Sequence, residues 1–202
     1  MIEIDQPPVL PRELTSLSAE VNAVEAPPTP RLTDPWTVRV ADADLDAEQL
    51  SEWMNQPHLA EAWEYAWPNE RWRQHIQAQL DGRYSRPFIV GFDGKNVGYL
   101  EVYRAAKDSI APRYDADPHD LGVHVAIAEL EFVNRGVAPM LMPYLAASLF
   151  DSDPSCRRIM FDPDYRNTNA RKVCEVGGCE FLGEHDMANR RMALYALHRA
   201  DG

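Results

Sequence analysis

Short runs rich in alternating or β-branched apolar residues mark most of the chain after residue 35, and each run predicts a β-strand. The runs are 36–42 (WTVRVAD), 86–93 (RPFIVGFD), 96–105 (NVGYLEVYRA), 120–127 (DLGVHVAI), 157–164, 179–186 and 190–199. Between the second and third runs, Asp93-Gly94 is a strong signal for a tight hairpin turn.

Apolar residues at helical spacing predict helices over 46–55, 68–82 and 167–178, and segment 134–150 predicts a glycine-containing turn that leads into a fourth, apolar helix. Asp46 suits an N-cap, and Gly82 suits a helix end. The predicted order is β-α-α-β-β-β-α-β-α-β-β. Helices between the later strands favour an α/β fold with a mixed sheet and parallel pairing beside residues 120–127.

The first 35 residues have a different texture, with seven of the sixteen prolines and no sustained apolar period. They predict an extended arm that is partly disordered or wrapped over the surface, before a globular domain at 36–202.

The net charge of −12 disfavours nucleic acid as a partner. No apolar run predicts a membrane span, and the first residues do not read as a secretory signal. The three cysteines lack metal-site spacing, so we expect reduced thiols, a cytoplasmic protein and no metal.

The strand at 120–127 carries the first chemical signal. Leu121, Val123, Val125 and Ile127 share one face, and the other face is small except for Asp120 and His124. By itself such a histidine is most simply a structural one. The Gly136 turn that follows opens a helix, whose N-terminal amides suit a phosphate.

Two motifs then carry a family resemblance. Arg135–Ala138 (RGVA) forms the turn, and 162–170 reads D-P-x-x-x-N-x-x-A. With the order of elements, these motifs resemble the GCN5-related N-acetyltransferase (GNAT) superfamily. The family turn usually reads R/Q-x-x-G-x-G/A, and here Ala138 and Met140 replace its two glycines. The tryptophan-rich segment 53–65 and the Asp-x-Gly-x-His element resemble the siderophore-biosynthesis branch, above all the mycobactin lysine N-acyltransferases.

The resemblance implies a GNAT fold, in which α-helices flank a mixed central β-sheet with splayed parallel strands. It also implies an acyl donor, either acyl-CoA or acyl-phosphopantetheine on an acyl carrier protein, inserted at the splay. The residues expected to hold the donor are Val125, Ala126, Ile127, Ala128, Arg135, Gly136, Val137, Ala138, Met140, Asn167 and Arg171. The acceptor would be a small molecule, the side-chain amine or hydroxylamine of lysine or hydroxylysine, or a siderophore precursor.

For catalysis the resemblance implies His124 as general base with Asp162 as its partner. The open alternative is that His124 only shapes the pocket. Small Gly122 and Ala126 would leave space for substrate. The residues expected to contact the acyl chain or acceptor are His58, Trp63, Trp67 and Asp120. Cys174 stands where many relatives carry a tyrosine that protonates the leaving thiolate, so the general acid stays open.

Two other functions fit some of these features. An aminoglycoside N-acetyltransferase shares the D-P-x-x-x-N-x-x-A motif, and an acidic protein suits polycationic acceptors. A non-catalytic acyl-CoA-binding module would tolerate the altered turn and the absent tyrosine. The tryptophan-rich segment favours the siderophore function over the first alternative, and His124 with Asp162 favours catalysis over the second.

Overall fold

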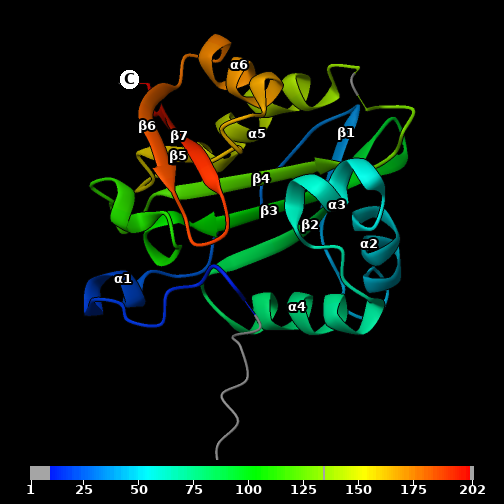
Figure 1. The fold of residues 1–202 in the computed structure, drawn as a ribbon, viewed down its shortest axis with the longest axis horizontal. Helices are drawn as coiled ribbons and strands as arrows, with labels where there is room; N and C mark the ends of the chain where they lie inside the picture. The colour runs from blue at the N-terminus through cyan, green and yellow to red at the C-terminus, as the bar shows by residue number, and fades with distance from the viewer. Residues whose placement is uncertain (1–9, 134, 201–202) are drawn as a thin grey trace, which may run out of the picture.

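A computed structural model of the chain describes residues 10–133 and 135–200. Nine residues of the predicted arm, 1–9, lie outside this range, as does Asn134 of the predicted β-α turn. A seven-stranded sheet runs through the molecule in the order β1-β2-β3-β4-β5-β7-β6 (Figure 1). Its strands are β1 Trp36–Val40, β2 Ser85–Phe92, β3 Lys95–Arg104, β4 Leu121–Ile127, β5 Arg158–Phe161, β6 Glu180–Asp186 and β7 Arg191–His198.

Helices cover both faces of the sheet (Figure 1). They are α1 Ala19–Ala23, α2 Ala47–Met54, α3 Pro57–Trp63, α4 Asn69–Asp81, α5 Val137–Ser152 and α6 Thr168–Val176, with short 3-10 turns at Ala105–Lys107 and Ala111–Arg113. All seven predicted strands and four predicted helices are present. Helices α1 and α3 were not predicted, because five and seven residues are too few to show a clear helical period.

Two large apolar clusters form the core, one on each face of the sheet. The first joins α5 to β1–β5 and includes the odd residues Leu121 and Val123 of β4. The second joins α2, α3 and α4 to β2–β4 and includes Ala126. The alternation predicted for 120–127 is therefore confirmed, and His124 points toward the side covered by α2–α4.

Strands β4 and β5 supply the predicted parallel pair and the predicted splay. Their ladder has two register pairs, Leu121↔Ile159 and Gly122↔Met160. On its other side β4 pairs antiparallel with β3 along its full length, from Leu121 to Ile127. The β5-facing edge of β4 is thus without a strand partner beyond Gly122 among the described residues, and α5 and α6 both begin after the ends of these two strands.

The β2–β3 hairpin closes at Asp93-Gly94 as predicted. Both residues have positive φ, 49° and 78°. Two-residue turns of this kind match the twist of the flanking strands. The turn leads into β3, whose pairing with β2 shifts register between Val90 and Gly91. Strand β3 carries Glu101 and Tyr103, which contact His124.

Candidate active site

His124 and Asp162, predicted to act together, lie side by side in the structure. His124 is on β4, and Asp162 follows directly after β5. The Nε2 atom of His124 is 2.8 Å from Oδ1 of Asp162, and their side chains are 16% and 0% exposed. The splay of the two strands begins one residue before these positions, so the pair sits at the opening between them.

A second carboxylate approaches the opposite nitrogen of the ring. Oε1 of Glu101, on β3, lies 3.4 Å from Nδ1 of His124. Glu101 is the register partner of His124 in the β3–β4 ladder and is 2% exposed. Its other oxygen accepts hydrogen bonds from Gln79 and Tyr99. The ring of Tyr103 stacks on the imidazole, with centroids 4.7 Å apart.

Asp162 is held by three further donors. The hydroxyl of Tyr103 donates to Oδ1 at 2.9 Å. Arg12, from the predicted arm, donates to Oδ2 at 2.7 Å, and Arg190 donates both to this oxygen and to the backbone carbonyl. A buried charge with this many charge-assisted hydrogen bonds is fixed in both position and ionisation.

The pKa values of the cluster follow from these contacts. Burial acts to raise the pKa of Asp162, but Arg12, His124 and Arg190 outweigh it and hold the pKa well below its ordinary range. Burial likewise acts to raise the pKa of Glu101, but the neighbouring rings of His124 and His75 outweigh it and hold the pKa below its ordinary range.

The pKa of His124 is raised above 6.5. Burial lowers it, Asp162 raises it more, Arg12 lowers it, and the hydrogen bonds to Asp162 and Glu101 raise it further. These contacts thus favour the charged imidazolium form of His124. Acceptance of a proton by His124 requires its neutral form.

Sequence reasoning missed Glu101, Arg12 and Arg190. Glu101 carried a usable signal, because it is a single acidic residue in an otherwise apolar strand, and a buried charge requires a partner. Arg12 carried none, since it lies 150 positions from Asp162 and no local pattern links the two. Arg190 was visible only as part of the basic pair Arg190–Arg191, which does not indicate a carboxylate partner.

Alternate residues of β4 direct their backbone groups away from β3, toward the edge where an added strand, such as the pantetheine chain of an acyl donor, could pair. Ala128 donates its N–H to Val97 of β3, and the carbonyl oxygen of Ala126 also faces β3, beside Gly98. By strand alternation, the backbone groups of Val125 and Ile127 face the opposite, unpaired edge. Of the four predicted donor contacts on and just after β4, Val125 and Ile127 thus face the splay, whereas the backbone groups of Ala126 and Ala128 pair with β3.

The predicted phosphate turn leads into α5. Gly136 has φ 76° as the residue before the helix. Arg135 and Met140 are exposed, Ala138 is half-buried, and the side chain of Val137 lies in the core. The backbone N–H groups of the first turn of α5 are therefore the groups at this turn that can face an anion.

Asn167 caps α6 and Arg171 lies on it, and both side chains have partners within the fold. Asn167 is the N-cap residue, and its side chain accepts from the N–H of Ala170. Arg171 contacts Glu184 at 2.8 Å and the hydroxyl of Tyr195 at 3.1 Å. None of these contacts tests the predicted role of the two side chains in binding the acyl donor, which stays a prediction.

Of the predicted substrate contacts, Trp63 lies nearest to His124. Its ring meets the imidazole edge-on, with centroids 5.8 Å apart. His58 approaches the end of β4, with Nε2 3.3 Å from the carbonyl oxygen of Ile127. Trp67 stacks on Tyr65 one ring further away, with centroids 4.2 Å apart.

Asp120 does not join this group. Its carboxylate is fully buried and is occupied by Arg158 and the hydroxyl of Tyr114. The predicted contact of Asp120 with substrate is therefore wrong, because its carboxylate anchors the neighbouring loop to β5. The interpretation that small Gly122 and Ala126 leave room for substrate is also wrong. The buried ring of Tyr103 covers Gly122, and Ala126 is 1% exposed within the core.

Cys174 is packed between α6 and β7, against Ala193 and Tyr195. Its hydrogen bond with Cys179 and its burial raise the pKa of the Cys174 thiol. This environment suits neither a nucleophile nor a proton donor at neutral pH. Within residues 10–133 and 135–200, no group of three or more metal-ligating side chains is present, and no helix of the same residues could span a membrane.

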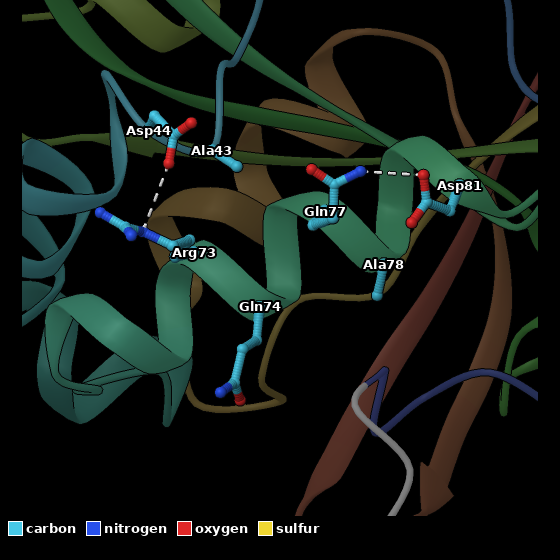
Figure 2. A pocket seen from close by; sticks show the side chains of 7 residues that line it. All are labelled: Ala43, Asp44, Arg73, Gln74, Gln77, Ala78 and Asp81. Carbon is cyan, nitrogen blue, oxygen red and sulfur yellow. Dashed lines mark hydrogen bonds and ion pairs between the residues drawn. The ribbon is translucent and has the colours of Figure 1, made fainter.

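The hollow shown in Figure 2 lies between α4 and the loop that carries Ala43 and Asp44, and its lining includes no residue in contact with His124 or Asp162. Arg73 and Gln77 line it, where Arg73 pairs with Asp44 at 3.6 Å. The opposite side of α4 carries Gln79, which contacts Glu101. The hollow therefore does not reach His124.

Comparison with known proteins identifies the family. Residues 42–187 match the family model for the acetyltransferase (GNAT) domain. The chain is 68% identical over 201 residues to the lysine N-acyltransferase MbtK of Mycobacterium sp. (strain MCS), which covers 98% of this chain and 82% of that protein. It is 59% identical over 188 residues to the lysine N-acyltransferase MbtK of Mycobacterium tuberculosis (strain CDC 1551 / Oshkosh), covering 93% of this chain and 89% of that one. The chain belongs to this family of GNAT N-acyltransferases.

The GNAT fold is also seen in solved structures. The aminoglycoside acetyltransferase AAC(6')-Ib in complex with coenzyme A superposes with a TM-score of 0.72, covering 81% of this chain and 95% of that chain. The two sequences are 24% identical, so this likeness concerns the fold. The predictions of a GNAT acyltransferase and of its mixed sheet are confirmed.

Proposed function

We propose that this GNAT enzyme moves an acyl group from a thioester donor to the side-chain nitrogen of lysine or hydroxylysine in siderophore biosynthesis, with His124 as the general base. The observation that carries the mechanism is the placement of His124 at the β4–β5 splay, between Glu101 and Asp162. The identity to lysine N-acyltransferases supports the acceptor class.

The donor would be acyl-CoA or an acyl-phosphopantetheine. Its amides would pair with the backbone edge of β4 that faces the splay, at Val125 and at the N–H of Ile127, whose carbonyl lies beside His58. The phosphates of coenzyme A would lie on the first amides of α5, from Arg135 to Met140. An N–H on the unpaired edge of β4 would stabilise the oxyanion of the tetrahedral intermediate.

Proton transfer is assigned to the Nε2 atom of His124. Nδ1 faces the buried carboxylate of Glu101, so in the neutral ring that keeps its proton on Nδ1 the Nε2 lone pair is the one that can take a proton. The acceptor nitrogen attacks the thioester carbon, the C–N bond forms, and its proton passes to Nε2. Asp162 then stabilises the imidazolium. The C–S bond breaks, and the thiol leaves as a thiolate whose ordinary pKa, about 8.5, makes a dedicated acid unnecessary.

Replacement of His124 by alanine tests the base. We expect kcat to fall by about 10²–10⁴-fold, because general base catalysis contributes on this order. The affinity for coenzyme A, measured by calorimetry, should stay within about threefold, since the backbone binds the donor. His198, which is 53% exposed and pairs with Glu180 at the far end of β7, gives the matched control His198→Ala. A variant with full kcat on hydroxylysine would remove His124 from the mechanism.

The acceptor class is tested separately with wild-type enzyme. The lysine-type function predicts kcat/KM for lysine or hydroxylysine at least 100-fold above that for kanamycin. The opposite order would establish the aminoglycoside alternative. Absence of thiol release with any of these acceptors would leave the non-catalytic binding module.

A carrier protein is the second possible source of the donor. Carrier proteins are acidic, so docking requires exposed basic residues near the splay. Lys172 is exposed on α6, which begins just after Asp162, whereas Arg157 precedes β5, roughly 16 Å from Asp162 along the strand. Lys172→Glu should weaken carrier-dependent turnover more than CoA-dependent turnover, with Arg157→Glu as control. Equal effects on both donors would argue against docking at α6.

A further inference from the structure

The N-terminal arm reaches the catalytic cluster and is fixed there by backbone contacts. The N–H of Leu14 donates to the carbonyl of Lys107, and the N–H of Ser109 donates to the carbonyl of Arg12, both at 2.9 Å. Leu10 is buried against Tyr103 and its neighbours. These contacts surround Arg12, so its side chain leaves the arm at a defined point above the β3–β4–β5 face.

The guanidinium of Arg12 bridges three groups of the cluster. Its NH1 atom lies 2.9 Å from Nε2 of His124. Its NH2 atom donates to Asp162 at 2.7 Å and to Asp108 at 3.0 Å. The group also lies over the ring of Tyr103, 5.5 Å from the centroid. Asp108 and Asp162 are fully buried, so the pairing satisfies charges that water cannot reach.

These contacts give Nε2 of His124 two competing partners. When Nε2 is protonated, it donates to Asp162, and the nearby guanidinium repels the imidazolium. When Nε2 is neutral, its lone pair accepts an N–H from Arg12. Asp162 thus stabilises the charged ring and Arg12 the neutral ring. An acceptor N–H arriving at Nε2 would take the position of one guanidinium N–H, while NH2 stays on the two carboxylates.

We propose that Arg12 is a positioning residue of the catalytic centre: the arm places its guanidinium so that it fixes Asp162 and keeps the Nε2 lone pair of His124 available for a proton. This inference rests on the proposed function of His124 as base. It makes the arm part of the active site, although the GNAT domain match begins at residue 42.

Other charged groups around the ring do not replace Arg12. Those that face His124 directly or through its carboxylates are Glu101 from β3, Asp162 after β5, Arg190 before β7, Asp108 after β3, His75 from α4, and the hydroxyls of Tyr103 and Tyr84. Arg190 contacts Asp162 but has no contact with the imidazole among those observed. Arg12 is therefore the cation that acts on Nε2 itself, consistent with its lowering effect on the pKa of His124.

The test compares Arg12→Gln and Arg12→Lys in the full-length enzyme. For Arg12→Gln we expect the acid limb of the kcat/KM profile to move up by about one pH unit, with roughly a tenfold loss on that limb, because one adjacent positive charge is gone. Arg12→Lys keeps the charge and should hold the acid limb at its wild-type position. Arg31, an exposed arginine of the same arm, supplies the control Arg31→Gln, for which the profile should not change.

Titration of the His124 ring by NMR gives a readout that does not depend on turnover. Its pKa should rise in Arg12→Gln and stay near the wild-type value in Arg12→Lys. An unchanged ring pKa in Arg12→Gln would overturn the inference, and so would an increase in acceptor KM alone, because that would make Arg12 a substrate ligand. Full activity of His124→Ala would instead refute the proposed base. If His124→Ala lost activity but the pH profile of Arg12→Gln did not shift, only the role of Arg12 would be refuted.

Discussion

Glu101 and His124 face each other across the β3–β4 ladder, with Oε1 of the glutamate 3.4 Å from Nδ1 of the imidazole. They are register partners, and Glu101 is almost fully buried. The two carboxylates beside the ring contact different nitrogens. In the proposed mechanism Glu101 favours a proton on Nδ1, and Asp162 stabilises the charge that forms when Nε2 takes a proton.

Replacing Glu101 by glutamine should move the acid limb of the activity profile to lower pH. The substitution removes a negative charge that favours the imidazolium, so the pKa of His124 falls by about one unit. The plateau kcat should also fall, because a glutamine orients the ring less strongly than a carboxylate. Profiles of kcat/KM against pH measure both effects.

Glu131 gives the matched control, since it is 53% exposed and pairs with Lys95 at the surface. Glu131→Gln should leave the profile in place. The predicted shift for Glu101→Gln is opposite in sign to that for Arg12→Gln. An upward shift would mean that Glu101 does not act on the charge of His124.

Asp162 should govern part of the acid sensitivity of the fold. Its pKa is held well below 3.8 in the folded chain, so it contributes stability above its unfolded pKa, about 3.9, and this contribution is lost as pH falls through the folded value. Asp162→Asn should cost about 3 kcal/mol near pH 7, because Arg12 and Arg190 lose a buried partner. Below pH 4 the gap to wild type should narrow.

Urea unfolding at pH 7, 5, 4 and 3 measures that convergence. Asp186, with a side chain 82% exposed, gives the control Asp186→Asn. Parallel stability curves for wild type and Asp162→Asn would show that another carboxylate governs the acid limb of stability.

The strands and the central pair of the site could be predicted because their signals are local. Alternation in 120–127 placed His124 on one face, and the D-P-x-x-x-N-x-x-A motif placed Asp162 at a strand end. The surroundings of the pair could not be predicted in the same way. Arg12 meets Asp162 through the tertiary path of the arm, and Asp120 turned inward to Arg158, an outcome that burial and partner geometry decide.

Gly122 illustrates the same limit and yields a prediction. A Cβ there would lie 2.0 Å from Cζ of Tyr103, whose ring is fully buried and whose hydroxyl holds Asp162. Gly122→Ala should therefore displace Tyr103, cost about 1–3 kcal/mol of stability by overpacking and lower kcat. Urea unfolding and steady-state kinetics measure the two losses.

Gly82 is the control, because a methyl group there would meet the carbonyl oxygen of Ala78 at 3.2 Å and touch no residue of the site. Gly82→Ala should retain kcat. If Gly122→Ala lost stability but kept full kcat, the packing of Tyr103 would be irrelevant to the placement of Asp162.

Trp63 should influence acyl-chain selection, because its ring is the aromatic surface in edge contact with His124. A thioester beside His124 would direct its acyl chain along such a surface. Trp63→Ala enlarges the space, so the ratio of kcat/KM for long over short acyl donors should change by roughly 10-fold or more, given about 1 kcal/mol or more for each methylene group gained or lost in a pocket. A donor-length series from acetyl to long-chain acyl thioesters measures the ratio.

Trp67→Ala is the matched control, since Trp67 packs on Tyr65 and Trp72 and its carbonyl accepts a hydrogen bond from Ser51. It should lower stability with little effect on chain-length preference. Equal changes in preference for both variants would place the acyl chain along the whole aromatic cluster instead of beside Trp63.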